Sequence, residues 1–542
     1  MGFAKTYSAQ PSVLGARIID VEVDISKGLN NLTIVGLGDK SVGESRDRIS
    51  GAIKNSGFKS PKQSNQKVVI SLAPADLKKE GPVFDLAMAI AYLTANEELF
   101  FNPEGKIFLG ELSLDGNLRK ISGVLPAVAE AKKKGFTEIY LPKENAREAA
   151  LISDILIYGA NTLEEVITHL TLGEKSEEEV DPEIFEAEEN KKDIAGQLIN
   201  RFHKNSRKIS VQPKTKIDLP DEENEIDFSD VVGQESAKRG LEIAAAGGHN
   251  IAMYGPPGTG KTMLAKAFSG ILPPLSFEEI IEITGIHSVA GTLKGDLVSV
   301  PPIRAPHHTA SYVSLVGGGT IPKPGEVTLA HRGVLFLDEF PEFEKKVLET
   351  LRQPLEEREI SIARARGSIT FPANFILIAA MNPCPCGNYG SKTKECICRA
   401  VDLLKYQRKL SGPIMDRIDM WVEVSQINHA DLSGRKSDNQ TKNNPKIRAR
   451  ISTAREKQKT RFAKLKRKVK TNSEMNSKDI SNLIELSLEV KKILDQSAVK
   501  LDLSARAYHR VIKLARTIAD LEKRENIELP HILEALQYRP KN

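Results

Sequence analysis

The chain of 542 residues lacks several features that would place it in a specialised class. No stretch approaches the roughly 18 apolar residues that cross a bilayer, and no charged segment followed by an apolar one opens the chain, so we expect a cytoplasmic protein. Aromatic residues make up only 5% of the chain, with a single tryptophan, which leaves few side chains to stack on nucleic-acid bases. The content of hydrophobic residues, 40%, is that of an ordinary globular protein.

Cysteine is also scarce, and the four cysteines lie close together, at Cys384, Cys386, Cys396 and Cys398. Structural disulfides are rare in cytoplasmic proteins, so this clustering predicts four thiolates that converge on Zn²⁺. The Cys-x-Cys spacing is tighter than the Cys-x-x-Cys of common zinc sites, and free thiols in a loop are the alternative.

An excess of charge of one sign is nearly absent overall, since the net charge is only +5. The charges are nevertheless unevenly distributed. Residues 174–189 contain nine acids, whereas residues 448–470 contain eleven lysines or arginines and a single glutamate. The basic run is either a solvated helix face or a surface that contacts the phosphate backbone of a nucleic acid.

The most informative motif lies at residues 255–262, between an apolar run that predicts a strand and a segment that predicts a helix. Glycines allow backbone N–H groups to surround phosphates, Lys261 brings a positive charge to the β and γ oxygens, and Thr262 offers its hydroxyl to Mg²⁺. We therefore predict a P-loop that binds ATP with Mg²⁺. Its residues are Gly255, Pro256, Pro257, Gly258, Thr259, Gly260, Lys261 and Thr262.

A second part of a hydrolytic site is predicted where the apolar run 333–337 ends in Asp338 and Glu339. A continuous apolar run is typical of a parallel strand buried on both faces. At its carboxyl end Asp338 would complete the Mg²⁺ shell and Glu339 would polarise the attacking water. Either acid alone could be a solvated strand end, but the P-loop favours the catalytic interpretation.

A third apolar run, 375–380, leads to Asn382, whose amide could orient the water or touch the γ-phosphate. This arrangement resembles the sensor-1 position of AAA+ ATPases. Residues 411–419 resemble the segment that carries their arginine finger, which implies that Arg417 acts on a neighbouring subunit's nucleotide. Residues 503–506 resemble their sensor-2 helix, which implies that Arg506 acts on the chain's own nucleotide. Surface ion pairs are the alternative for both arginines.

Several blocks in the same order give a more specific resemblance. They are Asp227 to Gln234, Ile303 to His308, Pro322 to His331, Asn382 to Gly387 and Ala535 to Arg539. With them the chain resembles the magnesium-chelatase-like AAA+ proteins of the ComM/YifB type, over nearly its whole length except about 174–225. The resemblance implies a ring, expected to be a hexamer, that moves single-stranded or branched DNA as a helicase in recombination or natural transformation. No motif encodes that role directly.

The expected fold class is α/β, with a Lon-protease-like N-terminal domain, a P-loop AAA+ core and a C-terminal helical lid domain. The predicted boundaries are 1–172 for the Lon-like domain, 173–225 for an acidic linker with a short helix near 194–202, 226–425 for the core and 426–542 for the lid. Within the first domain, Val83 and Leu125 stand where the Lon resemblance requires a nucleophilic serine and its activating lysine. A Ser–Lys mechanism needs both groups, so we expect no peptidase activity.

Two features of the core point beyond plain hydrolysis. Residues 358–371 alternate in the manner of a β-hairpin, which would place Arg364 and Arg366 at an exposed tip. In related ring ATPases such a hairpin lines the pore, so these arginines are expected to contact DNA; a purely structural hairpin is the alternative. The second feature is the glycine-rich segment 286–326, which resembles the helix-2 insertion of the same ATPases and would also face the pore. Its histidines His307 and His308 have no carboxylate or thiol beside them in the sequence, and we predict that they are structural or face the substrate.

Three other functions stay open at this point. A motor subunit for the insertion of Mg²⁺ into a porphyrin is disfavoured by the N-terminal domain and the cysteine cluster. An ATP-dependent protease of the Lon type is disfavoured by Val83 and Leu125. A scaffold that binds ATP without hydrolysing it is disfavoured by Glu339, Asn382 and Arg417.

Overall fold

The structure is a computed structural model of the whole chain. It describes residues 2–12, 15–63, 65–172, 209–215, 226–293, 295, 297–319, 323–364, 367–390, 394–426, 443–465, 467 and 469–540. Most of the predicted linker, including the helix expected near 194–202, lies outside these residues. The chain forms two compact units, residues 1–218 with 280–298 and residues 219–279 with 299–542, and each has a hydrophobic core of its own.

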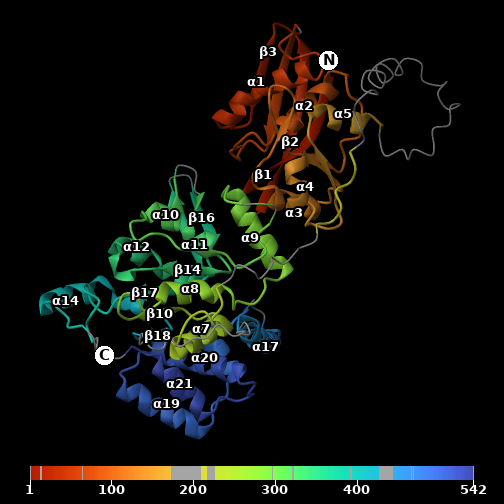
Figure 1. Cartoon of the computed structure of the whole chain (residues 1–542). Helices are drawn as coiled ribbons and strands as arrows, with labels where there is room; N and C mark the ends of the chain where they lie inside the picture. Colours follow the sequence, from red (N-terminus) through yellow and green to blue (C-terminus); the bar gives the residue numbers. More distant parts are fainter. Residues whose placement is uncertain are drawn as a thin grey trace. The chain divides into compact units, whose positions relative to one another are not determined.

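The first unit is built on a four-stranded sheet in the order β1-β2-β4-β3; β1, β2 and β3 are labelled in Figure 1. Strands β1 (Gly2–Ser12) and β2 (Gly15–Lys27) form an antiparallel hairpin, β4 (Gln66–Ala73) pairs antiparallel with β2, and β3 (Asn31–Val35) is parallel to β4. Helix α2 (Asp85–Ala95) is buried along almost its whole length and packs against β1 and β2, which explains its uniformly apolar sequence.

A second, parallel sheet of the first unit has the order β5-β8-β9. The remaining elements are α1 (Lys40–Asn55), β5 (Lys106–Phe108), β6 (Glu111–Leu112), β7 (Leu118–Arg119), α3 (Val124–Lys133), β8 (Glu138–Pro142), α4 (Lys143–Ala149), β9 (Leu156–Ala160) and α5 (Leu163–Leu172). The predicted alternation of strands and helices is confirmed. Val83 and Leu125 are both buried.

The second unit contains a five-stranded parallel sheet in the order β11-β14-β17-β10-β18. These strands are β10 (Ile251–Tyr254), β11 (Ile303–Arg304), β14 (Val334–Leu337), β17 (Ile376–Met381) and β18 (Met420–Glu423). All residues of β14 and β17 are buried, as expected for strands covered on both faces. The three apolar runs predicted as strands are therefore confirmed, and β17 lies between β10 and β14.

Helices and short elements surround this sheet. They are α7 (Glu235–Gly247), α8 (Lys261–Ser269), α10 (Tyr312–Val316), β12 (Gly317–Gly318), β13 (Lys323–Pro324), α11 (Glu326–Leu329), η3 (Phe340–Glu342), α12 (Lys345–Thr350), α13 (Arg352–Glu357), α14 (Ala400–Lys409) and α15 (Gly412–Met415). Helix α9 (Phe277–Val289) begins in the second unit, and its residues from Ile280 onward belong to the first. The predicted hairpin is confirmed by β15 (Glu359–Arg364) and β16 (Gly367–Pro372), which pair antiparallel. Arg366 and the side chain of Arg364 lie outside the described residues.

The C-terminal part of the second unit is helical, with α17 (Asn444–Phe462), η4 (Asn472–Glu474), α18 (Ser477–Leu483), α19 (Leu488–Lys500), α20 (Ala505–Leu521) and α21 (Leu529–Gln537) (Figure 1). Helices α17 and α20 pack against α7, and their apolar residues share one core with the parallel sheet. Among the described residues, no helix is both long enough and apolar enough to cross a membrane.

Candidate active site

The P-loop connects the carboxyl end of β10 to the first turn of α8. Gly258 and Gly260 have φ angles of +76° and +89°, in the left-handed region where a side chain is strained, so the loop needs glycine at both positions. A loop of this kind directs backbone N–H groups toward one point at a helix N-terminus, where an anion is favoured. The predicted phosphate-binding loop therefore has the required backbone.

Lys261 begins α8 and is largely buried. Its ammonium group donates to the carbonyl oxygens of Gly255 and Pro256, at 2.8 Å each, and to Oδ1 of Asn382 at 3.2 Å. Burial lowers the pKa of Lys261, and the nearby charge of Asp338 opposes that shift. The structure thus brings the P-loop lysine and the residue predicted as sensor 1 into direct contact.

The predicted Mg²⁺ ligands also meet. Oγ1 of Thr262 donates to Oδ2 of Asp338 at 2.8 Å, although the two residues lie on different elements, at the start of α8 and after β14. A hydroxyl and a carboxylate oxygen are the kinds of ligand that Mg²⁺ takes from a protein beside phosphate oxygens and water. This pair fits the ion chemically.

Glu339 follows Asp338 and presents its side chain to solvent, while its backbone N–H donates to Oδ1 of Asp338 at 2.9 Å. Its φ of +51° is uncommon for a residue with a side chain and costs roughly 1 kcal/mol or more. Such a conformation persists where the surroundings fix it. Here it turns the chain sharply at the carboxyl edge of the sheet, directly after the buried strand.

His308 lies beside Glu339, with its Nδ1 atom 2.9 Å from Oε2 of the carboxylate. The sequence has no carboxylate next to His307 and His308, and the structure brings one that is distant in the sequence, that of Glu339, to His308. The signal was available in the sheet order, because β11 pairs with β14 and residues after neighbouring parallel strands meet at one edge. The ring of His307 lies 4.1 Å from that of His308, between centroids, and its Nδ1 contacts Thr309.

Arg417 and Arg506 lie at the other edge of the sheet. The side chain of Asn250, just before β10, donates to the carbonyl oxygen of Arg417 at 3.3 Å. The guanidinium of Arg417 donates to the carbonyl oxygen of Pro413 at 2.7 Å and pairs with Glu356, and Arg506 pairs with the same carboxylate at 3.0 Å. Both predicted arginines therefore share one acid at the amino edge, whereas the P-loop lies at the carboxyl edge.

The position of α20 supports the placement of Arg506 at the amino edge of the sheet. Arg510, one turn after Arg506, lies 3.3 Å from Asp419, which directly precedes β18. Asp419 accepts the backbone N–H of Asn250 at 2.9 Å. Burial would raise the pKa of Asp419, but His249 and Arg510 outweigh it, and the pKa is lowered.

The four cysteines converge. The Sγ atoms all lie within 4.8 Å of one another, and three of the separations are 3.4, 3.6 and 3.8 Å. Four sulfurs about 2.3 Å from a tetrahedral Zn²⁺ lie about 3.8 Å apart, so these separations suit a metal. The backbone N–H of Tyr389 donates to Sγ of Cys384 at 3.3 Å, and that of Asn388 lowers the pKa of Cys386 to about 6. These two contacts favour thiolates at Cys384 and Cys386. In spite of backbone hydrogen bonds that lower them, the pKa values of Cys396 and Cys398 are raised by burial and by the neighbouring thiols.

This cysteine loop adjoins the P-loop. A Cβ atom on Gly387 would lie 2.5 Å from Cδ of Pro257, so the two loops are in close contact. Tyr406 donates its hydroxyl to the carbonyl oxygen of Asn382 at 3.0 Å, two residues before the first cysteine. The cysteine cluster and the nucleotide loop are thus mechanically connected.

The basic run 448–470 is largely occupied within the chain, in contrast to a freely solvated helix face. Arg461 pairs with the buried Asp520 at 2.5 Å and Lys470 with Glu279 at 2.7 Å. Further partners are Gly270 for Arg448, Glu242 for Arg450, Ala245 for Arg455 and Asp479 for Arg467. Four of these six residues, Arg448, Arg450, Arg455 and Lys470, connect the C-terminal helical part to the core.

A parallel sheet with a P-loop after one strand, paired acids after another and a polar amide after the strand between them defines a P-loop ATPase of the AAA+ class. The family models agree. Residues 227–432 match "Magnesium chelatase, subunit ChlI", residues 21–145 match "Subunit ChlI of Mg-chelatase" and residues 441–539 match "Magnesium chelatase, subunit ChlI C-terminal". The chain belongs to this magnesium-chelatase-like family and is of the ComM/YifB type.

Curated relatives span nearly the whole chain. It is 41% identical to the competence protein ComM of Haemophilus influenzae over 99% of this chain and 98% of that protein. It is 40% identical to the uncharacterized protein YifB of Salmonella typhimurium over 99% and 97%. A shorter similarity, 35% identity over 91 residues, relates 17% of this chain to 21% of the DNA repair protein RadA of Streptococcus pneumoniae.

Proposed function

We propose that this protein is an ATP-hydrolysing ring motor, a hexamer, that moves branched DNA in recombination or natural transformation. The observation that carries the ATPase part is the convergence of Lys261, Thr262, Asp338, Glu339 and Asn382 at one sheet edge. The DNA part is supported by the similarity to a competence protein and, over a short stretch, to a DNA repair protein.

In the proposed mechanism the P-loop N–H groups and Lys261 bind the phosphates. Thr262 and Asp338 would hold Mg²⁺, which neutralises charge on the β and γ phosphates when it is bound. Glu339 polarises the attacking water, and Asn382 orients it or contacts the γ-phosphate. His308 already binds Oε2 of Glu339, and while it does so this oxygen is less available to the attacking water. We propose that His308 thereby restrains hydrolysis.

The ring is supported by the arginines at the opposite edge. An arginine finger stabilises charge on a γ-phosphate, so Arg417 needs a nucleotide close to it. Its own chain would hold its nucleotide at the opposite edge of the sheet. A neighbouring subunit in a ring supplies it. Since Arg506 shares Glu356 with Arg417, we propose that Arg506 acts on the same neighbouring nucleotide, in place of the chain's own nucleotide.

Zn²⁺ is proposed for the cysteine cluster because the four sulfurs are spaced for a tetrahedral site. Its role would be structural, since four thiolates leave no open position for a substrate. The contact between Gly387 and Pro257 would transmit the rigidity of the metal site to the P-loop.

A motor subunit for magnesium chelation is the second candidate, favoured by the three family models. The match of residues 21–145 to a model described as a chelatase subunit also weakens the N-terminal domain as an argument against it. The cysteine cluster is the feature that still separates the two functions.

The test is the ATPase rate of the full chain with no DNA, single-stranded DNA, duplex DNA and forked DNA. A DNA motor predicts a severalfold increase with single-stranded or forked DNA over the rate without DNA. Equal rates under all four conditions would contradict the DNA function while leaving the ATPase intact, which is what the chelatase alternative predicts.

A further inference from the structure

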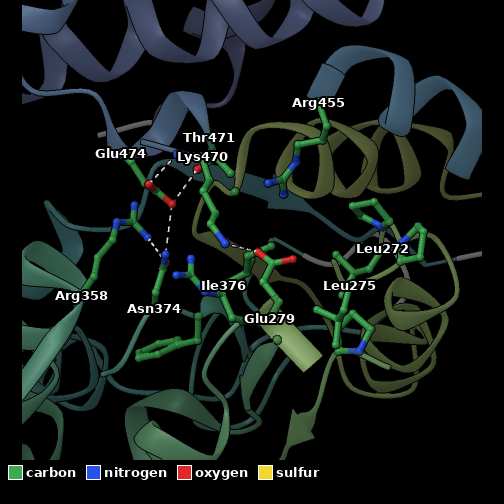
Figure 2. A pocket seen from close by; sticks show the side chains of 17 residues that line it. Leu272, Leu275, Glu279, Arg358, Asn374, Ile376, Arg455, Lys470, Thr471 and Glu474 are labelled. Atoms are coloured by element: carbon green, nitrogen blue, oxygen red, sulfur yellow. Dashed lines mark hydrogen bonds and ion pairs between the residues drawn. The ribbon is translucent and has the colours of Figure 1, made fainter. Parts of the chain in front are cut away.

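The second unit contains a cavity of about 100 Å³ that is separate from the P-loop (Figure 2). It lies at the amino edge of the parallel sheet, because its lining includes Gly333, just before β14, and Ile376, the first residue of β17. Its wall also includes residues of the segment after α8, of α17 and of the segment around η4 in the C-terminal helical part. Residues of the core and of the C-terminal helices therefore face one another across it.

The lining carries more positive than negative charge. Its cations are Arg332, Arg358, Arg455 and Lys470, and its acids are Glu279 and Glu474. The acids already have partners: Glu279 accepts from the Lys470 ammonium at 2.7 Å, and Glu474 accepts from the Lys470 backbone N–H at 2.9 Å. Asn374 donates to the second oxygen of Glu474 at 3.0 Å. The net charge of the lining is positive.

Arg455 is the cation with the least compensation. Its guanidinium donates to the carbonyl oxygen of Ala245 at 2.7 Å, while its Nε atom is buried without a hydrogen-bond partner in the described part of the chain. No carboxylate of the described residues forms an ion pair with it. Burial lowers its pKa to about 10, against the opposing effect of Glu474 and Glu279. Glu474 and Glu279 lie near Arg455 but neither bonds to it, so an anion that binds directly to its guanidinium would stabilise the charge.

Arg358 stands in a similar environment. Its two terminal nitrogens donate to neutral oxygens, Oδ1 of Asn374 at 2.6 Å and Oγ of Ser473 at 2.9 Å. Burial lowers the pKa of Arg358, in spite of the nearby charge of Glu474. Figure 2 shows its guanidinium and that of Arg455 on two sides of the central Lys470–Glu279 pair.

The remaining wall is apolar. Leu272 and Leu275 flank two prolines in the segment after α8, and Phe375 and Ile376 also contribute. In Figure 2 Leu272 and Leu275 lie across the cavity from Arg358 and Asn374. A ligand with an anionic end and an uncharged body matches this division.

We propose that this cavity binds a small phosphorylated molecule, with its phosphate group held by Arg455 and the neighbouring cations and its body against Leu272 and Leu275. Guanidinium groups bind phosphate through two parallel hydrogen bonds, which makes arginine suited to this ligand. The cavity is too small for a duplex. Because the ligand would contact both the core and α17, it would stabilise the second unit against unfolding.

The test uses the full chain with Lys261→Ala, so that the P-loop does not bind the probe. The probe is inorganic pyrophosphate, titrated calorimetrically without Mg²⁺, and we expect saturable binding at one site per chain. Arg455→Gln in the same background should weaken binding by about tenfold or more, as expected for the loss of a charge-assisted hydrogen bond. The matched control is Lys459→Gln, which removes an exposed charge from the same helix and should leave the affinity unchanged.

Thermal unfolding without pyrophosphate shows whether the Arg455→Gln protein is folded. If it is not, Leu275→Glu decides, because it leaves every cation in place and adds a repelling charge at the apolar wall; it should weaken binding similarly. Three results would overturn the proposal. One is a calorimetric signal with pyrophosphate no larger than that with NaCl at equal ionic strength, and another is equal pyrophosphate affinity in all folded variants. The third is binding of single-stranded DNA that depends on Arg455, without binding of pyrophosphate.

Discussion

The two edges of the parallel sheet in the second unit differ in how their charged groups are satisfied. At the carboxyl edge the complementary groups meet within the chain: Lys261 contacts Asn382, Thr262 contacts Asp338, and His308 contacts Glu339. At the amino edge, Arg417 and Arg506 converge on one half-exposed carboxylate, that of Glu356. The carboxyl edge therefore has the groups of a nucleotide site. The amino edge has two arginines that share a single carboxylate and could bind a further anion.

This difference suggests that each chain contributes the P-loop part of one nucleotide site and the arginines of another. Ion pairs near the surface contribute only about 0.2–1 kcal/mol, so a γ-phosphate could displace Glu356 at little cost. The P-loop and the arginines of a single chain lie at opposite edges of its sheet, so under the proposed function the arginines act on the nucleotide of a second chain. The proposed ring follows from that separation.

The largest expected effects separate binding from hydrolysis at the carboxyl edge. Lys261→Ala should abolish measurable ATP binding, because it removes the charge on the β and γ oxygens. Glu339→Gln should bind ATP with near-normal affinity and hydrolyse it at least about 10²-fold more slowly, because the water loses its base. Equilibrium nucleotide binding and steady-state phosphate release measure the two effects. Wild-type turnover by the Glu339→Gln protein would refute the assignment.

The next prediction asks whether the carboxyl edge depends on the cysteine cluster. The purified chain should contain about one Zn²⁺, and Cys384→Ser should lose it, with a lower unfolding temperature and weaker ATP binding through the contact of Gly387 with Pro257. Elemental analysis, calorimetry and nucleotide titration check these points. Metal-free protein with four titratable thiols and full ATP affinity would leave the cysteines as ordinary loop residues.

A smaller effect is expected for the hairpin that joins α13 at the amino edge to β17. If Arg364 and Arg366 each contact a DNA phosphate, replacing both with alanine should reduce the slope of log affinity against log salt by about 2. The control is Lys457→Ala with Lys459→Ala, which removes two charges from α17. DNA binding measured by fluorescence anisotropy at several salt concentrations gives the slopes. Equal slopes for the wild type and the hairpin variant would make the hairpin purely structural.

The smallest effect concerns the restraint on Glu339. His308→Ala should raise the ATPase rate without DNA severalfold, because Oε2 of Glu339 then no longer bonds to the ring and both carboxylate oxygens can accept from water. His307→Ala is the matched control, since His307 bonds to Thr309 and leaves the Glu339 contact in place. A basal rate that falls equally in both variants would mean that His308 only supports the local structure.

Much of the carboxyl edge could be predicted from the sequence, because each part is local. The P-loop needs glycines at fixed spacing, and a strand buried on both faces needs a continuous apolar run, as in β14 and β17. Parallel strands then bring their carboxyl ends together, so the meeting of Thr262 with Asp338 follows from local patterns.

The amino edge could not be predicted in the same way. Glu356 has no motif of its own, and its contacts with Arg417 and Arg506 depend on how α13, α15 and α20 pack. The same holds for the internal partners of the basic run, since Asp520 lies on a distant helix. The sequence shows which residues are charged, whereas the packing of distant elements decides which of these charges are paired within the chain and which can bind a ligand.

The most direct test of the account combines the two edges in one assay. Arg417→Ala protein should bind ATP and lose hydrolysis by about 10³-fold or more, the usual effect of removing an arginine finger. Lys261→Ala protein is also inactive. When the two are mixed, an intact P-loop of one chain can adjoin an intact Arg417 of the other, so the account predicts that part of the ATPase activity returns. If light scattering shows that the two variants co-assemble and no activity returns, the composite site between subunits is contradicted.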